Sequence, residues 1–213
     1  MSPRPTAYRH LDELLADYGK HQEPIRTRLA EFSRVQPEEY FFEMTYCLLT
    51  PQSSAAHAQA AVELLRQSGC WDDVTMVAAA LRRTSSYIRF HNTKAARVVL
   101  TWNSWPSIAR MLTDHVPSSD LRAWLVANVK GLGLKEASHF LRNIGRRDLA
   151  ILDRHILKNL RYHGLLRTLP RTLNVRRYLA TERRFRCFAA EVGIPMDELD
   201  LLFWSRETGQ ILK

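Results

Sequence analysis

A lysine and an aspartate eighteen residues apart are the side chains of this sequence best suited to chemistry. Lys135 comes directly after a turn that contains Gly131 and Gly133, and Asp153 precedes a further apolar-periodic segment. A lysine amine that has lost its proton is a nucleophile, and an ionised carboxylate stabilises a developing positive charge. The two side chains could therefore divide one reaction between attack and charge stabilisation.

The two glycines lie between segments that carry apolar residues at helical spacing, residues 119–129 and 134–144. Glycine accepts positive φ without a steric penalty and lets an external surface approach the backbone. The amides at the start of the second segment are expected to be unpaired and suited to a phosphate oxygen. We interpret this region as a DNA-binding hairpin, and with Lys135 and Asp153 it indicates chemistry on DNA.

A purely structural interpretation is open for each of these residues. Pairs of helices also use glycine turns for packing alone, and most helical lysines are solvated. Lys135 is expected to point outward, on a face shared with Ser138, His139 and Arg142. Asp153 is a predicted N-cap of the helix that follows. Capping favours the ionised carboxylate and aims it, so this role does not exclude a catalytic one.

Basic residues are concentrated beside and after the hairpin. Residues 142–186 contain thirteen arginines and lysines against three acids, a net charge of +10, whereas the whole chain carries +9. This distribution predicts a polyanion that binds through its phosphates. A solvated basic helix face is the alternative.

The composition excludes several other classes of protein. The 213 residues, 46% of them apolar, suffice for one or two packed domains. Three widely spaced cysteines predict neither a disulfide framework nor an iron–sulfur cluster, and eight histidines lack metal-ligand spacing, so we expect no catalytic metal. The apolar runs are too short for a membrane span and the N-terminus has no signal-peptide core, so we expect no membrane partner.

Nearly all of the chain has the pattern of amphipathic helices. The predicted helices occupy residues 8–32, 37–49, 54–68, 73–83, 93–103, 105–113, 119–129, 134–144, 153–162, 171–191 and 195–205. Short stretches with Pro, Gly or Ser separate them, and no convincing run of alternating strand residues occurs. The sequence therefore predicts an all-α fold.

Residues 129–135, Val-Lys-Gly-Leu-Gly-Leu-Lys, followed by Asp153, resemble the helix-hairpin-helix and aspartate signature of the DNA glycosylase superfamily. Residues 129–160 are most similar to the short prokaryotic 8-oxoguanine DNA glycosylase/AP lyases, the second family with that activity. The loop before Asp153 lacks the glycine and proline of the superfamily, a departure that the short family tolerates. Further similarity lies in residues 48–54, 87–97 and 198–213.

The resemblance implies an all-α fold with two helical subdomains and an active-site cleft between them. The central subdomain would comprise residues 36–146 and end in the helix-hairpin-helix at about residues 120–145. The second would combine residues 1–35 with 147–213 from the two ends of the chain.

The same resemblance implies a bifunctional enzyme whose partner is double-stranded DNA containing 8-oxoguanine. A base inside a duplex is out of reach, so the target nucleotide is flipped out. Lys135 would attack C1′ of the sugar and displace the damaged base, and the resulting imine, a Schiff base, would permit β-elimination. Asp153 would stabilise the oxocarbenium-like sugar. No cofactor is required, although a structural monovalent or divalent cation at the hairpin backbone carbonyls is compatible with this scheme.

Further DNA contacts are implied by shorter matching stretches. Gln52 would fill the gap left by the flipped nucleotide, although a polar residue in the turn after Pro51 is the structural alternative. The remaining contacts with DNA are assigned to Lys130, Gly131, Gly133 and His155.

Recognition of the damaged base is implied for four residues. Phe90 would face the extruded base and Trp204 would stack on it. The carboxylate of the chain-terminal Lys213 would accept the N–H donors of guanine, with Asp200 as a further acceptor. Core packing is the alternative for Phe90 and Trp204, and a frayed end is the alternative for Lys213.

Two other functions stay open. One is the same scaffold with another oxidised-base specificity, such as an oxidised pyrimidine; the lack of iron–sulfur cysteines and the Trp204 to Lys213 ending argue against it. The other is a non-catalytic helix-hairpin-helix DNA-binding module, which needs neither Lys135 nor Asp153. We expect a monomer in the cytoplasm of a prokaryote, associated with the nucleoid through DNA.

Overall fold

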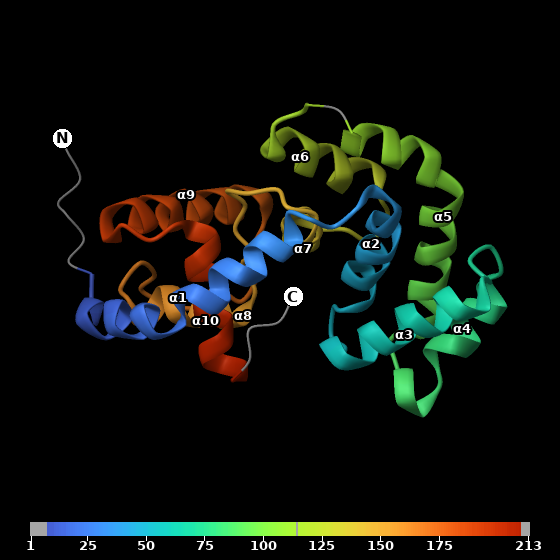
Figure 1. Ribbon diagram of the computed structural model, residues 1–213, viewed down its shortest axis with the longest axis horizontal. Helices are drawn as coiled ribbons and strands as arrows, with labels where there is room; N and C mark the ends of the chain where they lie inside the picture. Colours follow the sequence, from blue (N-terminus) through green and yellow to red (C-terminus); the bar gives the residue numbers. More distant parts are fainter. Residues whose placement is uncertain (1–7, 114, 210–213) are drawn as a thin grey trace. The chain divides into compact units, whose positions relative to one another are not determined.

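The structure, a computed structural model, describes residues 8–113 and 115–209. These residues form ten α-helices and two short 3-10 helices, and no strand occurs among them (Figure 1). The prediction of an all-α fold is therefore confirmed. The chain divides into two compact units. Unit 1 combines Met1–Arg34 with Gly145–Lys213, and unit 2 is Val35–Ile144.

Unit 2 is built around α2, Tyr40–Leu49. This helix is apolar on all sides, and its residues from Met44 to Leu49 are buried, as expected of a helix at the centre of a core. It packs against three other helices of the unit. The other helices of unit 2 are α3 (Ala55–Ser68), α4 (Val74–Leu81), α5 (His91–Thr113), α6 (Ser118–Asn128) and α7 (Leu134–Asn143), and the 3-10 helices are Pro37–Glu39 and Thr84–Ser86.

One helix of unit 2 differs from its prediction. The sequence predicts two helices, residues 93–103 and 105–113, but α5 runs without a break from His91 to Thr113 with Pro106 inside it. Proline removes one backbone hydrogen bond and bends a helix rather than always ending it. Figure 1 shows α5 bent along its length. Buried residues on both sides of Pro106, such as Val99 and Ile108, keep the two halves packed on the same unit.

Unit 1 contains α1 (Leu11–Phe32), α8 (Arg154–Tyr162), α9 (Val175–Val192) and α10 (Met196–Thr208). Helix α10 packs against the other three. Its Phe203 stacks on Phe185 and on His163, with ring centroids 5.9 and 5.4 Å apart. Aromatic stacking thus joins α9 and the end of α8 to α10 in one core.

Gly145 shows why the chain enters the C-terminal part of unit 1 through a glycine. Its φ is +84°, and a Cβ there would lie 2.8 Å from Cα of Ser33. Both the conformation and the close approach to the end of α1 exclude a side chain.

Candidate active site

The hairpin connects α6 to α7 within unit 2, as predicted. Gly131 has φ +106°, and a Cβ at this position would lie 2.6 Å from Cδ of Arg97. Gly133 has φ −93°, so the left-handed conformation is needed only at Gly131. The first glycine is thus required by its backbone conformation, and the flexible Arg97 side chain passes close to it.

The amides at the start of α7 are not all unpaired. The N–H of Gly133 donates to Oε2 of Glu136 at 3.2 Å, and Oε1 of the same carboxylate lies 3.7 Å from Nζ of Lys135. The expectation of unpaired amides is therefore wrong at Gly133. A phosphate that binds this amide has to displace Glu136, because both are acceptors for one donor.

Lys135 lies in the first turn of α7, and its side chain is 28% exposed. The predicted outward face does not exist, because Ser138, His139 and Arg142 are all buried. Helix α7 packs against both α2 and α6, which enclose it on two sides. Two of these polar side chains make hydrogen bonds inside the unit: Arg122 of α6 donates to Ser138 Oγ at 3.0 Å, and Arg142 donates to Asn143 Oδ1 at 3.3 Å.

Gln52 and Phe90 are both exposed, and both have a left-handed backbone, with φ of 58° and 60°. This conformation is costly for residues other than glycine and concentrates at functional sites. Phe90 is 52% exposed, so the alternative of core packing is excluded. The guanidinium of Arg89 lies 4.9 Å from its ring centroid. Both residues stay candidates for contacts with an extruded nucleotide.

Lys94 is a residue that sequence analysis did not single out. It is 2% exposed, and its Nζ donates to the carbonyls of Leu49 and Pro51 at 2.7 and 2.6 Å and to Ser53 Oγ at 3.2 Å. Burial, together with the charges of Arg97 and Lys135, lowers the pKa of its amine to about 8. Its position one turn before Val98, on the apolar face of α5, is the sequence signal that could have found it.

Asp153 lies in unit 1 and caps α8, as predicted. Its Oδ1 accepts the backbone N–H of His155 and of Ile156, each at 2.8 Å. The side chain is thereby fixed in direction, with Oδ2 left out of the two capping bonds. Lys135 belongs to unit 2, so the joint action of the two residues stays a prediction.

His155 and the residues around it form an ion cluster at the end of α10. His155 Nδ1 lies 3.2 Å from Oε2 of Glu207, and Lys158 Nζ lies 2.8 Å from the same oxygen. The hydrogen bond from Lys158, with that of His155 in addition, lowers the pKa of Glu207. The histidine ring is therefore held at the surface of unit 1, where its contact with DNA stays a prediction.

Helix α10 carries two of the residues assigned to base recognition. Asp200 is 3% exposed, whereas Trp204, one turn later, is partly exposed. Trp204 is accordingly not a fully enclosed core residue. Lys213 lies outside the described residues.

Five exposed arginines of unit 1 lie on α9. Arg176, Arg177, Arg183, Arg184 and Arg186 are exposed. Five more basic residues of 142–186 are exposed outside α9: Arg154, Lys158, Arg161, Arg167 and Arg171. The positive charge of this segment is thus spread over several parts of unit 1, where it is available to a polyanion.

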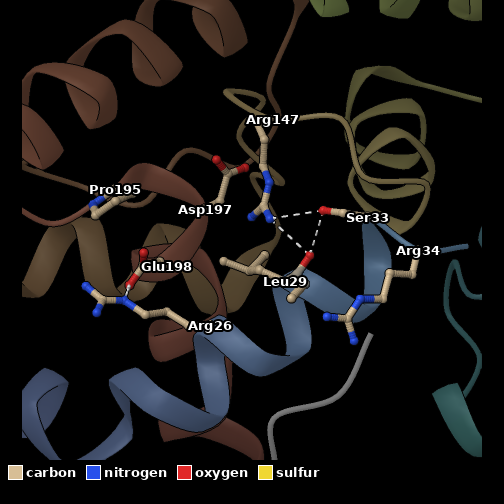
Figure 2. A pocket seen from close by; sticks show the side chains of 9 residues that line it. Arg26, Leu29, Ser33, Arg34, Arg147, Pro195, Asp197 and Glu198 are labelled. Carbon is tan, nitrogen blue, oxygen red and sulfur yellow. Dashed lines mark hydrogen bonds and ion pairs between the residues drawn. The ribbon is translucent and has the colours of Figure 1, made fainter.

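An open pocket of unit 1 contains none of the predicted site residues. Figure 2 shows Arg147 pointing to the carbonyl of Leu29 and to Ser33 Oγ, at 3.0 and 3.4 Å, and Arg26 paired with Glu198. These guanidinium groups bind the protein itself, so the pocket gives no support to a separate ligand site.

Neither a metal cluster nor a membrane helix occurs in the described part of the chain. Residues 8–113 and 115–209 contain no group of three His, Cys, Asp or Glu side chains placed to hold a metal ion. The three cysteines, Cys47, Cys70 and Cys187, are free thiols. None of the helices described is long and apolar enough to cross a membrane.

Comparison with known proteins identifies relatives over nearly the whole chain. The family model described as 8-oxoguanine DNA glycosylase matches residues 25–194. The 8-oxoguanine DNA glycosylase/AP lyase of Korarchaeum cryptofilum is 38% identical over 95% of this chain and 99% of its own. The 8-oxoguanine DNA glycosylase/AP lyase of Fusobacterium nucleatum is 35% identical over 96% of this chain and 98% of its own.

Solved structures agree with the sequence comparison. The crystal structure of the Thermotoga maritima 8-oxoguanine DNA glycosylase has a TM-score of 0.85 and 30% identity, and covers 95% of this chain and 98% of that one. The Methanocaldococcus jannaschii 8-oxoguanine glycosylase/lyase, solved with a 15mer DNA containing 8-oxoguanine, has a TM-score of 0.84, 30% identity and coverage of 94% and 100%. The resemblance of the hairpin sequence is thus confirmed, and the chain belongs to the 8-oxoguanine DNA glycosylase family.

Proposed function

We propose that this protein excises 8-oxoguanine from duplex DNA and then cleaves the strand 3′ to the abasic site. The observation that carries the proposal is the pairing of Lys135, placed directly after a DNA-binding hairpin, with the aimed carboxylate of Asp153. The relatives named 8-oxoguanine DNA glycosylase/AP lyase support the same activity over the full length of the fold. The M. jannaschii complex with 8-oxoguanine DNA supports the substrate.

In the proposed reaction the unprotonated amine of Lys135 attacks C1′ of the extruded nucleotide. A bond forms between Nζ and C1′, and the bond from C1′ to the base breaks, with its electron pair leaving on the base, which takes up a proton. Opening of the sugar ring then gives an imine. Loss of a proton from C2′ and departure of the 3′ phosphate complete the β-elimination. Water then hydrolyses the imine, which breaks the bond between Nζ and C1′ and frees Lys135, and no oxidant is needed.

Asp153 stabilises the positive charge that develops on the sugar as the base departs. The two backbone N–H bonds at Oδ1 fix the direction of the carboxylate for this role. The proposal requires that Lys135 and Asp153 reach the same sugar.

Base recognition is assigned to Phe90, Asp200, Trp204 and Lys213. The exposed ring of Phe90 and the partly exposed ring of Trp204 offer flat faces to a purine, which favours stacking. Contacts with the surrounding duplex are assigned to Gln52, Lys130, Gly131, Gly133 and His155. The exposed Lys130 adds a charge for a phosphate beside the hairpin.

The proposed chemistry uses protein groups alone and needs no cofactor or iron–sulfur cluster. A monovalent or divalent cation at the hairpin carbonyls would serve phosphate binding, and its contribution is measured by titrating salt and chelator against duplex affinity. We further propose that the protein acts as a monomer in the cytoplasm of a prokaryote, where its DNA substrate lies. Sedimentation of the protein with and without duplex DNA tests whether it is a monomer.

The decisive experiment incubates the protein with a duplex carrying one 8-oxoguanine, with borohydride present to reduce the imine. Wild type should give a covalent adduct, and Lys135→Gln should give none. Lys20→Gln, an exposed lysine of α1, is the matched control and should trap normally. Adduct that persists in Lys135→Gln would show that another amine attacks.

A panel of lesion duplexes separates the proposed activity from its rivals. Preference for an oxidised pyrimidine would indicate the same scaffold with another specificity. Binding of every duplex without excision or trapping would indicate a non-catalytic helix-hairpin-helix module.

The role of Lys213 has its own test. A peptide tag added after Lys213 removes the terminal carboxylate from its position and should slow excision of 8-oxoguanine, while cleavage of a ready-made abasic site continues. Unchanged excision by the tagged protein would remove the terminus from the base pocket.

A further inference from the structure

The ammonium of Lys94 is used entirely inside the protein. A protonated lysine has three N–H donors, and three acceptors surround this one: the carbonyls of Leu49 and Pro51 and the hydroxyl of Ser53. The side chain is 2% exposed, so Nζ is out of reach of a nucleotide sugar. A buried ammonium is costly, and here its hydrogen bonds all go to the last residue of α2 and the loop that follows it.

These acceptors lie on both sides of Gln52. The carbonyl of Pro51 belongs to the peptide unit that joins Pro51 to Gln52, and Ser53 is the next residue. Gln52 itself is exposed and has φ 58°, a conformation that a glutamine adopts only when its surroundings impose it. The Lys94 ammonium thus holds the backbone before and after the strained residue.

The Lys94 ammonium also reaches the turn that carries Phe90, through Ser53. Ser53 Oγ, one of the three acceptors of the ammonium, accepts the N–H of Arg89 at 3.0 Å. The two exposed residues with left-handed backbone, Gln52 and Phe90, are therefore tied to one buried lysine.

We propose that Lys94 is a positioning residue, which sets Gln52 and Phe90 for extrusion of the target nucleotide and takes no covalent part in the reaction. This inference rests on the proposed function. Lys94 then acts before the chemical step, because Gln52 is assigned to the gap in the duplex and Phe90 to the extruded base. Lys135 keeps the covalent task.

The test compares Lys94→Met with wild type and with the exposed control Lys20→Met. Extrusion is followed by the fluorescence of 2-aminopurine placed beside 8-oxoguanine, and excision by single-turnover kinetics. Lys94→Met should lose extrusion and excision by roughly 10- to 100-fold, the size expected for misplaced contacts. Cleavage of a ready-made abasic site should fall far less, and borohydride should still trap the adduct. Loss of trapping on the abasic site would show that Lys94 acts in the chemical step and would overturn the proposal.

A double-mutant cycle with Gln52→Ala separates positioning from a general loss of structure. If Lys94 acts through the loop, Lys94→Met should reduce extrusion by a clearly smaller factor in the Gln52→Ala background than in wild type. Equal losses in both backgrounds would overturn the proposal. Ser53→Ala, which removes one acceptor and the link to Arg89, repeats the cycle if Lys94→Met fails to fold.

The two proposals fail differently. A wild-type protein that leaves 8-oxoguanine in place overturns the proposed function and this inference with it. A wild-type protein that excises 8-oxoguanine, with extrusion unchanged in Lys94→Met and Ser53→Ala, overturns the role of Lys94 alone.

Discussion

Asp153 in unit 1 and Gln52 in unit 2 are held in place by opposite means. The carboxylate of Asp153 accepts N–H bonds from residues two and three positions later, so its direction follows from the start of its own helix. Gln52 is held through Pro51 by Lys94, which lies 43 residues after Pro51 and on a different helix. A local cap therefore tolerates a conservative replacement, whereas a long-range anchor couples several parts of a site.

The largest effect should come from removing the charge of Asp153 without removing its cap. Asp153→Asn should retain stability within a few tenths of a kcal/mol, because asparagine caps helices as well as aspartate does. It should lose base excision by roughly 100-fold or more, the size of a lost electrostatic contact to the transition state. Single-turnover excision and thermal unfolding measure the two quantities.

Asp153→Ala supplies the control for the cap. It should lose about 1 kcal/mol of unfolding free energy in addition to excision. Normal excision by Asp153→Asn would leave the residue with its structural role only.

The second prediction concerns how extrusion of the nucleotide depends on pH through the long-range contact of Lys94. The pKa of Lys94 is lowered to about 8 by burial and by Arg97 and Lys135, while Glu136 opposes the shift. The ammonium is the form with three donors, so it holds the loop below this pH and loses one donor above it. Extrusion by wild type should therefore fall as the pH rises through about 8.

A lesion analogue that resists cleavage isolates this effect from the protonation of Lys135. The 2-aminopurine signal is recorded between about pH 6.5 and 9.5, on both sides of the lysine transition. Lys94→Met should give a low signal that does not change with pH. An equal pH dependence in both proteins would assign the transition to another group.

The third effect concerns the strain at Gln52. Gln52→Gly should raise the unfolding free energy by up to about 1 kcal/mol, because glycine accepts the left-handed backbone that glutamine resists. The same change should slow excision, since the side chain assigned to the gap is gone. Gln52→Ala is the matched control, which loses the side chain but keeps the strain. Equal stability of the two variants would show that the loop relaxes without its strained residue.

The smallest effect concerns the hairpin. Glu136→Ala frees the N–H of Gly133 and removes a negative charge from the start of α7. Affinity for undamaged duplex should rise by about two- to fivefold, and more at low salt. Glu63→Ala, an exposed acid of α3, should leave the affinity unchanged. Weaker binding by Glu136→Ala would show that the capped form of the hairpin is the one that meets DNA.

Local features were predictable because each depends on a few neighbouring residues. Helical spacing and turn residues identified the helices on both sides of the hairpin. The order of Asp153 and the apolar residues after it identified the cap. Pro106 was misread as a break, because whether a proline ends a helix or bends it depends on the packing on both sides.

Backbone preferences and periodicity act over one or two turns, so the amino-acid sequence was enough to predict the all-α fold, the hairpin with Lys135 and the capping carboxylate. The burial of Ser138, His139 and Arg142 could not be predicted, since burial depends on the helices that enclose α7. The same holds for the buried lysine on α5 that bonds to the loop of Gln52. Such a contact joins segments distant in the chain, and it becomes visible only when folding brings a desolvated donor to its acceptors.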